Sequence, residues 1–409
     1  MKKLLGLFVV LALALPASAD VLKNVNLVGE IETIASDVHH DNIGWYNNNV
    51  NTRVLAGLSA NLVEDVTANV LFQYVTAWDG AMNGEYINDG GVDSYEANIE
   101  VANANVVLSN LFDCFEATIG RQFYGDEDSA VMYIGPNHFN AENFAYAPSI
   151  DAAKITYADD VKAFTFIAGK MPAGMNTINP NVNGTKLFGA DFRMNLTDIV
   201  KLQAYIYDFQ KTTVFDPDMA NEDTQAGLYG AKLTFNPEAF LASVEYARNY
   251  GGHRFIKEHE DTGYMWKADA KVNIEEFAVR GTFLYEKNTF VSYGNYAPGL
   301  LIGHNLATVA FGGINMYSAD GIRMFNVGLD VKPFEKWVFA VDGFTFQDRA
   351  GHHAATWETD LTAKYAHNEY VQLFAGAGYA KYHNANGAAW KDAFNKDNFK
   401  WQLGMLINF

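Results

Sequence analysis

Charged side chains recur at a spacing of two along several segments of this chain. Asp191 and Arg193 form one pair, and Lys267, Asp269 and Lys271 form a run of three. Residues two apart in an extended strand point to the same face, so each set would lie on one wall. Opposite charges on one wall either neutralise one another or set up a transverse field across an aqueous passage. The sequence leaves both interpretations open.

The same alternation predicts further residues on this polar wall. They are Arg53, Tyr205, Tyr207, Arg280, Glu358, Asp360 and Lys364. Acidic residues outnumber basic ones among the polar-face positions as a whole, which favours cations mildly over anions. The two tyrosines offer ring faces on which a sugar could stack. The chemistry expected of this wall is therefore selection of solutes during passage.

Residues that could catalyse a reaction do not form a recognisable set. The chain has no Gly-x-Ser-x-Gly motif, and no histidine falls securely within a strand beside a candidate nucleophile. The acidic clusters Asp126–Asp128 and Asp216–Asp223 could bind Ca²⁺, although a solvated acidic surface is the simpler interpretation. We therefore predict no enzymatic activity, no cofactor and no built metal site.

Strands of about ten residues, with apolar and polar side chains alternating, must position the polar wall. The pattern predicts them over residues 24–33, 50–62, 66–76, 93–109, 115–123, 151–157, 161–171, 186–194, 200–210, 225–235, 239–248, 262–273, 277–287, 322–332, 337–347, 356–366, 370–382 and 400–409. Short turns and long loops alternate between them. This rhythm predicts an all-β, antiparallel, up-and-down transmembrane barrel of about 18 strands, or about 16 if two loops are split wrongly. Its turns would be periplasmic and its loops extracellular.

The last strand has one apolar face, formed by Trp401, Leu403, Met405, Ile407 and Phe409. It resembles the C-terminal strand of bacterial outer-membrane barrels, whose terminal aromatic residue marks them for insertion. That resemblance implies the barrel-assembly machinery as a partner. The alternative is the last strand of a soluble sandwich, because such alternation is common in half-buried strands.

The N-terminus has the features of a cleaved secretory signal. Lys2 and Lys3 precede an apolar core, Leu4–Pro16, that is too short to span a bilayer, and Ala17–Ala19 is a small-residue cleavage site. We therefore expect a signal peptide over residues 1–19 and a single barrel domain over residues 20–409.

Composition favours a barrel over other membrane proteins. Aromatic residues make up 14% of the chain, while its formal net charge is −19 and its mean hydropathy is only −0.10. No segment after the signal has 18 uninterrupted apolar residues, so we do not expect membrane-spanning helices. The acidity excludes nucleic acid as a natural partner. The partners predicted instead are outer-membrane lipid, lipopolysaccharide and small hydrophilic solutes.

A segment that leaves one strand resembles a family signature. Ile119 is followed by Gly120, Arg121, Gln122, Phe123, Tyr124, Gly125 and Asp126. The segment is similar to the Gly-Arg-Gln…Tyr-Gly-Asp signature of the alginate-export family, with tighter spacing between Gln122 and Tyr124. The resemblance implies an 18-stranded barrel and a polysaccharide conduit. Such a conduit should have a basic lumen, and the mixed charges predicted here depart from that.

Two long loops are apolar enough to pack on something. Asp126–Ser149 and Asn288–Gly321 could fold into the barrel, contact a neighbouring subunit or pack among the other loops. The function predicted is passive diffusion of small hydrophilic solutes through a mixed-charge lumen in the outer membrane. The alternatives are a specific conduit for carbohydrate or exopolysaccharide and a plugged structural or adhesive barrel. The sequence does not determine the oligomeric state.

Overall fold

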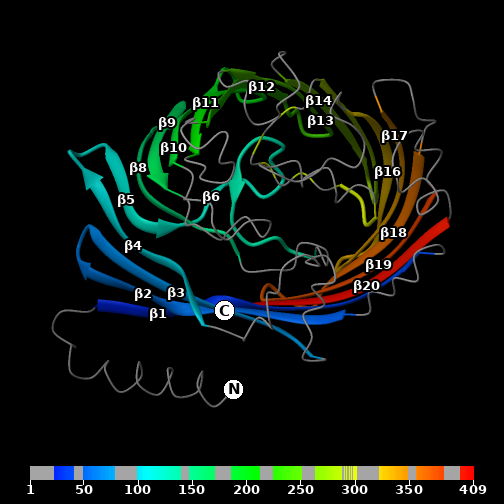
Figure 1. Cartoon of the computed structure of the whole chain (residues 1–409), viewed down its shortest axis with the longest axis horizontal. Helices are drawn as coiled ribbons and strands as arrows, with labels where there is room; N and C mark the ends of the chain where they lie inside the picture. Colours follow the sequence, from blue (N-terminus) through cyan, green and yellow to red (C-terminus); the bar gives the residue numbers. More distant parts are fainter. Residues whose placement is uncertain are drawn as a thin grey trace, which may run out of the picture.

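Eighteen antiparallel strands close into one barrel in the computed structural model of the chain (Figure 1). The structure describes residues 23–40, 49–78, 99–139, 147–170, 186–211, 224–250, 263–287, 290, 292, 294, 296, 298–301, 322–348, 356–381 and 397–409. The expected signal peptide lies outside these residues. No helical segment of the described chain has the length and apolar character that crossing a bilayer requires.

The first half of the wall alternates long connections with tight turns. Its strands are β1 (Lys23–His40), β2 (Asn49–Val63), β3 (Val66–Ala77), β4 (Glu100–Leu111), β5 (Phe115–Gln122), β8 (Ile150–Ala158), β9 (Lys162–Lys170), β10 (Lys186–Asn195) and β11 (Val200–Lys211). A separate two-stranded pair, β6 (Tyr124–Gly125) and β7 (Tyr133–Ile134), lies in the connection between β5 and β8.

The second half continues the same meander. Its strands are β12 (Thr224–Phe235), β13 (Phe240–Tyr250), β14 (Tyr264–Ile274), β15 (Phe277–Lys287), β16 (Ile322–Phe334), β17 (Trp337–Asp348), β18 (Thr356–Ala366), β19 (Val371–Lys381) and β20 (Asp397–Asn408). β20 pairs with β1 and closes the barrel. Gly29 and Phe409 exchange two backbone hydrogen bonds at this seam, of 2.9 and 3.0 Å. The prediction of 18 strands is confirmed, and the alternative of 16 is wrong.

The first strand is longer than the alternation predicted. Residues 37–40 were expected to lie in a loop, but they extend β1 because β20 begins at Asp397 and pairs with them. The ladder thus supplies backbone partners that a polar sequence alone does not indicate. The early part of the strand expected over 93–109 lies mostly outside the described residues, and β4 begins at Glu100.

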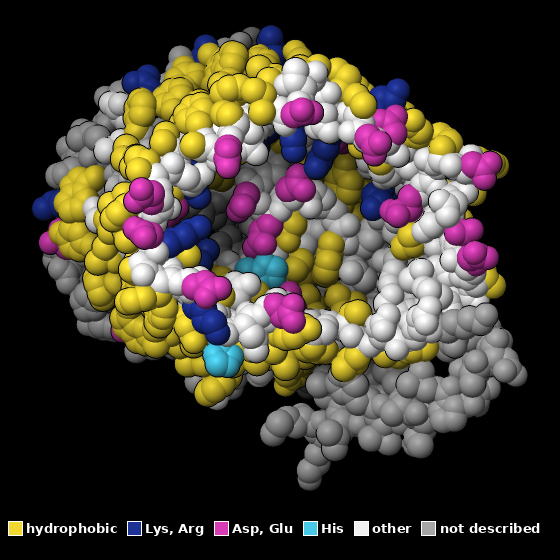
Figure 2. Space-filling model, turned by 180° about the vertical axis from the view of Figure 1, so that it is seen from behind, with side chains coloured by type: hydrophobic (Ala, Val, Ile, Leu, Met, Phe, Trp, Pro, Cys, Tyr) yellow, Lys and Arg dark blue, Asp and Glu magenta, His cyan; other side chains and the backbone are white. Residues whose placement is uncertain are grey.

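Apolar side chains cover the outer wall, whereas the lumen side carries most of the polar side chains together with a buried apolar cluster. Figure 2 shows one mouth of the barrel, with hydrophobic side chains on the outside, Asp and Glu around the rim and a hollow within. Phe325, Val327 and Leu361 are each more than half exposed on this outer wall. On β20, Trp401, Leu403 and Phe409 are exposed while Lys400 and Gln402 are buried on the lumen side. The three exposed residues, together with Met405 and Ile407, form the outward face that the sequence predicted for the insertion signal.

Candidate functional site

The predicted polar wall faces the lumen. Seven of its residues are buried there: Arg53, Asp191, Tyr205, Tyr207, Lys267, Glu358 and Asp360. The other five occupy lumen-facing positions of their strands and are more exposed to solvent: Arg193, Asp269, Lys271, Arg280 and Lys364. Burial this deep requires other groups to cover the wall, and two inward-folded loops provide them.

The first loop, which follows β5, is held against β1 and β2. Arg53 donates Nη2 to the carbonyl of Asn137 at 2.9 Å and also pairs with Glu32 at 2.6 Å and Glu30 at 3.2 Å. Glu32 in turn accepts the backbone N–H of Phe139. Buried charges are stable only when paired and hydrogen-bonded. The loop backbone completes this network, so it is fixed inside the barrel.

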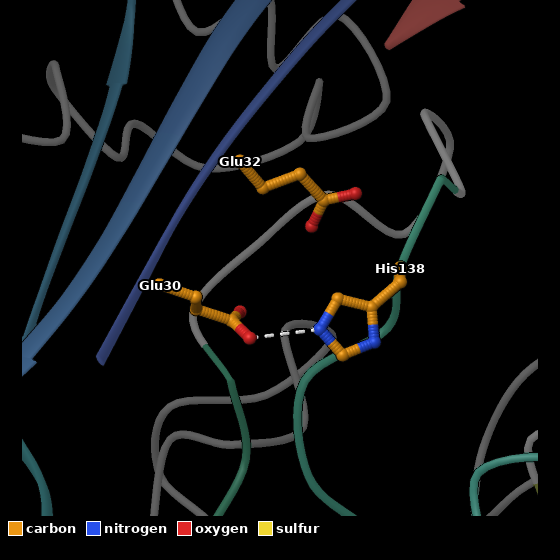
Figure 3. Close-up of side chains that lie close together, drawn as sticks. All are labelled: Glu30, Glu32 and His138. Atoms are coloured by element: carbon orange, nitrogen blue, oxygen red, sulfur yellow. Dashed lines mark hydrogen bonds and ion pairs between the residues drawn. The ribbon is translucent and has the colours of Figure 1, made fainter. Parts of the chain in front are cut away.

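His138 adds a second anchor for the same loop (Figure 3). Its Nε2 lies 2.9 Å from Glu30, and its Nδ1 lies 2.9 Å from Glu127. Burial by itself would lower the pKa of His138, but the hydrogen bonds to Glu127 and Glu30 raise it to about 10. The ring is therefore an imidazolium at neutral pH, clamped between the wall and its own loop.

Glu30, Glu32 and His138 have ligand atoms close enough together to suit a cation. Arg53, however, donates to both carboxylates, and both ring nitrogens of His138 already have carboxylate partners. A divalent cation would have to displace these contacts beside a fixed positive charge. The group therefore fits an ion-pair anchor better than a metal centre.

The second loop, between β15 and β16, is held by β18 and β20, and β20 is the direct neighbour of β1. Glu358 accepts the N–H of Leu301 at 2.7 Å, and Asp360 accepts that of Leu300 at 2.9 Å. Lys400 donates Nζ to the carbonyl of Leu300 at 2.9 Å. The predicted pore-lining role of Glu358 and Asp360 therefore needs correction, because they anchor a loop that covers them.

The two loops meet inside the barrel. Ser292 donates Oγ to the carbonyl of Ala130 at 3.0 Å, and Gly294 lies so close to Ala130 that an added Cβ would fall 2.1 Å from its carbonyl carbon. Tyr296 lies under the ammonium of Lys267, 4.2 Å from the ring centroid. Of the three interpretations of the apolar loops, folding into the barrel is thus the observed one for their described parts.

The aromatic residues of β11 form a stack along the lumen face. Tyr205, Tyr207 and Phe209 follow one another with ring centroids 5.9 and 6.4 Å apart. Met132 and Ile134 of the first loop belong to the same buried cluster. Only 6% of Tyr205 and 4% of Tyr207 is exposed, so their ring faces are not free to stack on a sugar. Their burial argues against a sugar-stacking surface at these positions, although both residues border a cavity.

A cavity of about 520 Å³ remains beside the first loop. Its charged lining residues are Asp126, Asp128, Asp191, Glu245, Lys154, Arg193 and Lys232. Arg193 bridges Asp191 at 2.9 Å and Asp126 at 3.0 Å, and the hydroxyl of Tyr205 donates to Glu245 at 2.8 Å. Among the described residues, Lys154 and Lys232 have no carboxylate partner. The lining is a mixed-charge one, as predicted.

Further along the lumen, opposite charges neutralise one another. Lys267 pairs with Asp269 at 2.8 Å. Arg280 joins Asp330 at 2.9 Å and also contacts Asp342, while Lys271 lies 3.7 Å from Asp330. Mutual neutralisation was one of the two interpretations of the spacing-two charges, and these contacts favour it for β14 to β17.

The residues of the expected family motif start the first loop. Gly120 takes a positive φ of 121° within β5, and Gln122 is buried, with its amide donating to three backbone carbonyls. Arg121 remains on the outer face and makes a two-pronged ion pair with Asp151. Beyond Gln122, Tyr124 and Gly125 form β6, which enters the lumen.

The first acidic cluster, Asp126–Asp128, is partly neutralised by basic side chains. Asp126 pairs with Arg193 and Glu127 with His138, whereas Asp128 lines the cavity. Binding of Ca²⁺ at this cluster stays a prediction. The second cluster, 216–223, lies outside the described residues.

Comparison with known proteins gives matches to solved structures. No family model matches the chain, and no curated protein matches it either. OccK5 (OpdH) of Pseudomonas aeruginosa superposes with a TM-score of 0.61 at 12% identity, covering 95% of this chain and 99% of that one. P. aeruginosa OpdK with vanillate gives 0.62 at 10% identity, covering 94% and 98%.

A structure from a second genus has the same architecture. Acinetobacter baumannii OccAB4 gives a TM-score of 0.61 at 10% identity, covering 95% of this chain and 98% of that one. None of these matches supports the alginate-export resemblance. Identity this low establishes fold alone. The chain therefore has the closed 18-stranded antiparallel barrel fold of the OccK/Opd porin structures.

Proposed function

We propose that this protein is an outer-membrane channel through which small hydrophilic solutes diffuse passively. The observation that carries the proposal is the mixed-charge cavity between the wall and the first loop. An 18-stranded barrel is wide enough for an aqueous channel unless something fills it. Here two anchored loops narrow the lumen, so passage is limited by size and by the charges that remain.

The outer wall supports placement in a bilayer. Its exposed apolar band is bordered by paired aromatic rings, such as Trp337 with Tyr365 at 4.7 Å and Trp357 with Tyr379 at 5.1 Å. Rings of this kind sit at membrane interfaces. We infer that the tight turns face the periplasm, that the loops face outward, and that the protein is not an enzyme.

The alternatives predict different contents of the lumen. A polysaccharide conduit should present continuous basic charge or open aromatic faces, whereas the rings of Tyr205 and Tyr207 are covered. A plugged structural or adhesive barrel would conduct nothing. Among the described residues, Lys154 and Lys232 line the cavity without carboxylate partners, which favours a passage that charged solutes can use.

The test is single-channel conductance of the purified protein in a planar bilayer, with the reversal potential measured under a salt gradient. We expect a small, steady, weakly selective conductance. Changing both Lys154 and Lys232 to Glu should shift the reversal potential towards cations, while the same change at Lys162, exposed on the outer face at the tight-turn end of β9, should not. Absence of conductance in folded protein would support a plug, and saturable block by an acidic oligosaccharide would support a specific conduit.

A further inference from the structure

Four side chains at the loop ends of neighbouring strands form one row on the outer face. Register pairs Arg121 of β5 with Asp151 of β8, Asp151 with Lys170 of β9, and Lys170 with Lys186 of β10. Directly paired residues of antiparallel strands point to the same side of a sheet. Figure 1 shows these four strands side by side in the wall.

The row has a net positive charge. Arg121 neutralises Asp151 through two hydrogen bonds, Nε to Oδ1 at 2.8 Å and Nη2 to Oδ2 at 3.0 Å. Lys170 and Lys186 are exposed and have no ion pair or hydrogen bond with any residue that the structure describes. Like charges directly opposite one another on a sheet are unfavourable. Two facing lysines therefore favour an anion from outside the protein.

The row lies where the apolar wall ends. Further from the loops, the same outer face carries Ile119, Phe166 and Phe188, which are 54%, 52% and 47% exposed. Each lies two or four residues along its strand from a residue of the row. Side chains at this height reach the headgroup layer of a bilayer, where lysines extend their ammonium groups towards phosphate. The tight turns at the other end instead carry acidic residues.

We propose that Lys170 and Lys186 bind the phosphate of a phosphorylated glycolipid in the outer leaflet. The inference rests on the proposed placement in the outer membrane with the loops outward. Two ammonium groups on adjacent strands can share one phosphate, since each offers up to three donors. Arg121 assists by neutralising Asp151, whose charge would otherwise repel the phosphate at the edge of the row.

The test measures binding of defined lipids to the purified, folded barrel by native mass spectrometry. The probe is a glucosamine-disaccharide lipid with two phosphates, compared with its dephosphorylated form and with phosphatidylglycerol. The double variant Lys170→Gln/Lys186→Gln should bind the diphosphorylated lipid about 30-fold more weakly. Dephosphorylation should weaken binding to the original protein to a similar extent.

The matched control is Lys162→Gln/Lys332→Gln. Lys162 lies at the opposite end of β9, so this variant loses the same charge at the tight-turn end. It should bind the diphosphorylated lipid as the original protein does. Arg121→Gln, which leaves Asp151 unpaired, should weaken binding to a smaller extent than loss of both lysines.

Three outcomes would overturn the inference. They are unchanged binding by the double lysine variant, indifference to dephosphorylation, and equal binding of phosphatidylglycerol, which would assign the row to a phospholipid instead. Conductance is recorded on the same preparations. Loss of lipid binding with normal conductance separates this site from the channel, whereas a protein that binds the lipid but does not conduct refutes only the proposed function.

Discussion

At the scale of single residues, several charged side chains of the lumen hold the inward-folded loops in place. Arg53 is 1% exposed yet satisfies two glutamates and a loop carbonyl at once. Removing one partner from a buried network leaves the opposite charge uncompensated, which is costlier than losing an exposed pair. Residues of this kind therefore control whether a loop stays folded in.

The first prediction concerns Arg53→Met. Without the guanidinium, the buried carboxylates of Glu30 and Glu32 lose the positively charged partner that they share. We therefore expect the free energy of unfolding to fall by about 3–5 kcal/mol. Urea denaturation in detergent micelles measures this, and the first loop should loosen so that conductance rises. Arg323→Met, an outward-facing change on β16, should shift stability by less than about 0.5 kcal/mol. Equal effects of the two variants would contradict the anchor.

The second prediction concerns the pH dependence of the His138 anchor. Because the pKa of His138 is raised from 6.5 to about 10, its stabilising contribution is complete below about pH 6.5 and is lost as pH rises through about 10. Conductance should therefore stay constant between about pH 5 and 8 and increase near pH 10. His138→Gln should remove that increase and show the looser state throughout. A change centred near pH 6.5 in the original protein would count against the paired imidazolium.

At the scale of elements, the strands were predictable and the loop positions were not. Period-two alternation gives each strand its face, because burial on one side fixes which residues point inward. All the predicted pore-lining residues do lie on the lumen side. Alternation carries no information about contacts between distant segments, such as Glu32 with Phe139, which are 107 residues apart.

The loops carried one usable signal. The apolar run around Met132 and Ile134 indicated packing against something, and both side chains are buried on the lumen wall. The partners at the other loop, Glu358 and Asp360, looked like solute-contacting carboxylates, since nothing local shows that backbone N–H groups would reach them. The covered tyrosines of β11 were misread for the same reason.

The third prediction tests the contact between the two loops. Gly294→Ala places a methyl group against the backbone of Ala130, where there is no space for it, so the loops must separate and conductance should increase. The matched control is Gly343→Ala, because an added Cβ there has its nearest neighbour 3.9 Å away. Thermal unfolding of the barrel should change little in either variant, since the loops are not part of the wall. Unaltered conductance in Gly294→Ala would show that this contact does not limit passage.

At the scale of the whole molecule, the proposed channel and the proposed lipid site both depend on how the barrel is oriented in the membrane. Both proposals need the tight turns on the periplasmic side, and one natural residue reports on it. Cys114, the only cysteine of the chain, is exposed in the turn between β4 and β5. A thiol reagent therefore identifies the side on which the turns lie without any substitution.

We predict that a polymer-linked maleimide, too large to pass the channel, labels Cys114 only after the outer membrane of whole cells is permeabilised. The reason is that the bilayer and the barrel wall both separate a periplasmic turn from the medium. The matched control moves the thiol to the loop end as Trp78→Cys in a Cys114→Ser background, since Trp78 is 69% exposed beyond β3. That variant should be labelled on intact cells. The reverse labelling pattern would show that the tight turns face the medium. Lys170 and Lys186 would then lie at the inner leaflet, which would contradict the proposed phosphate site.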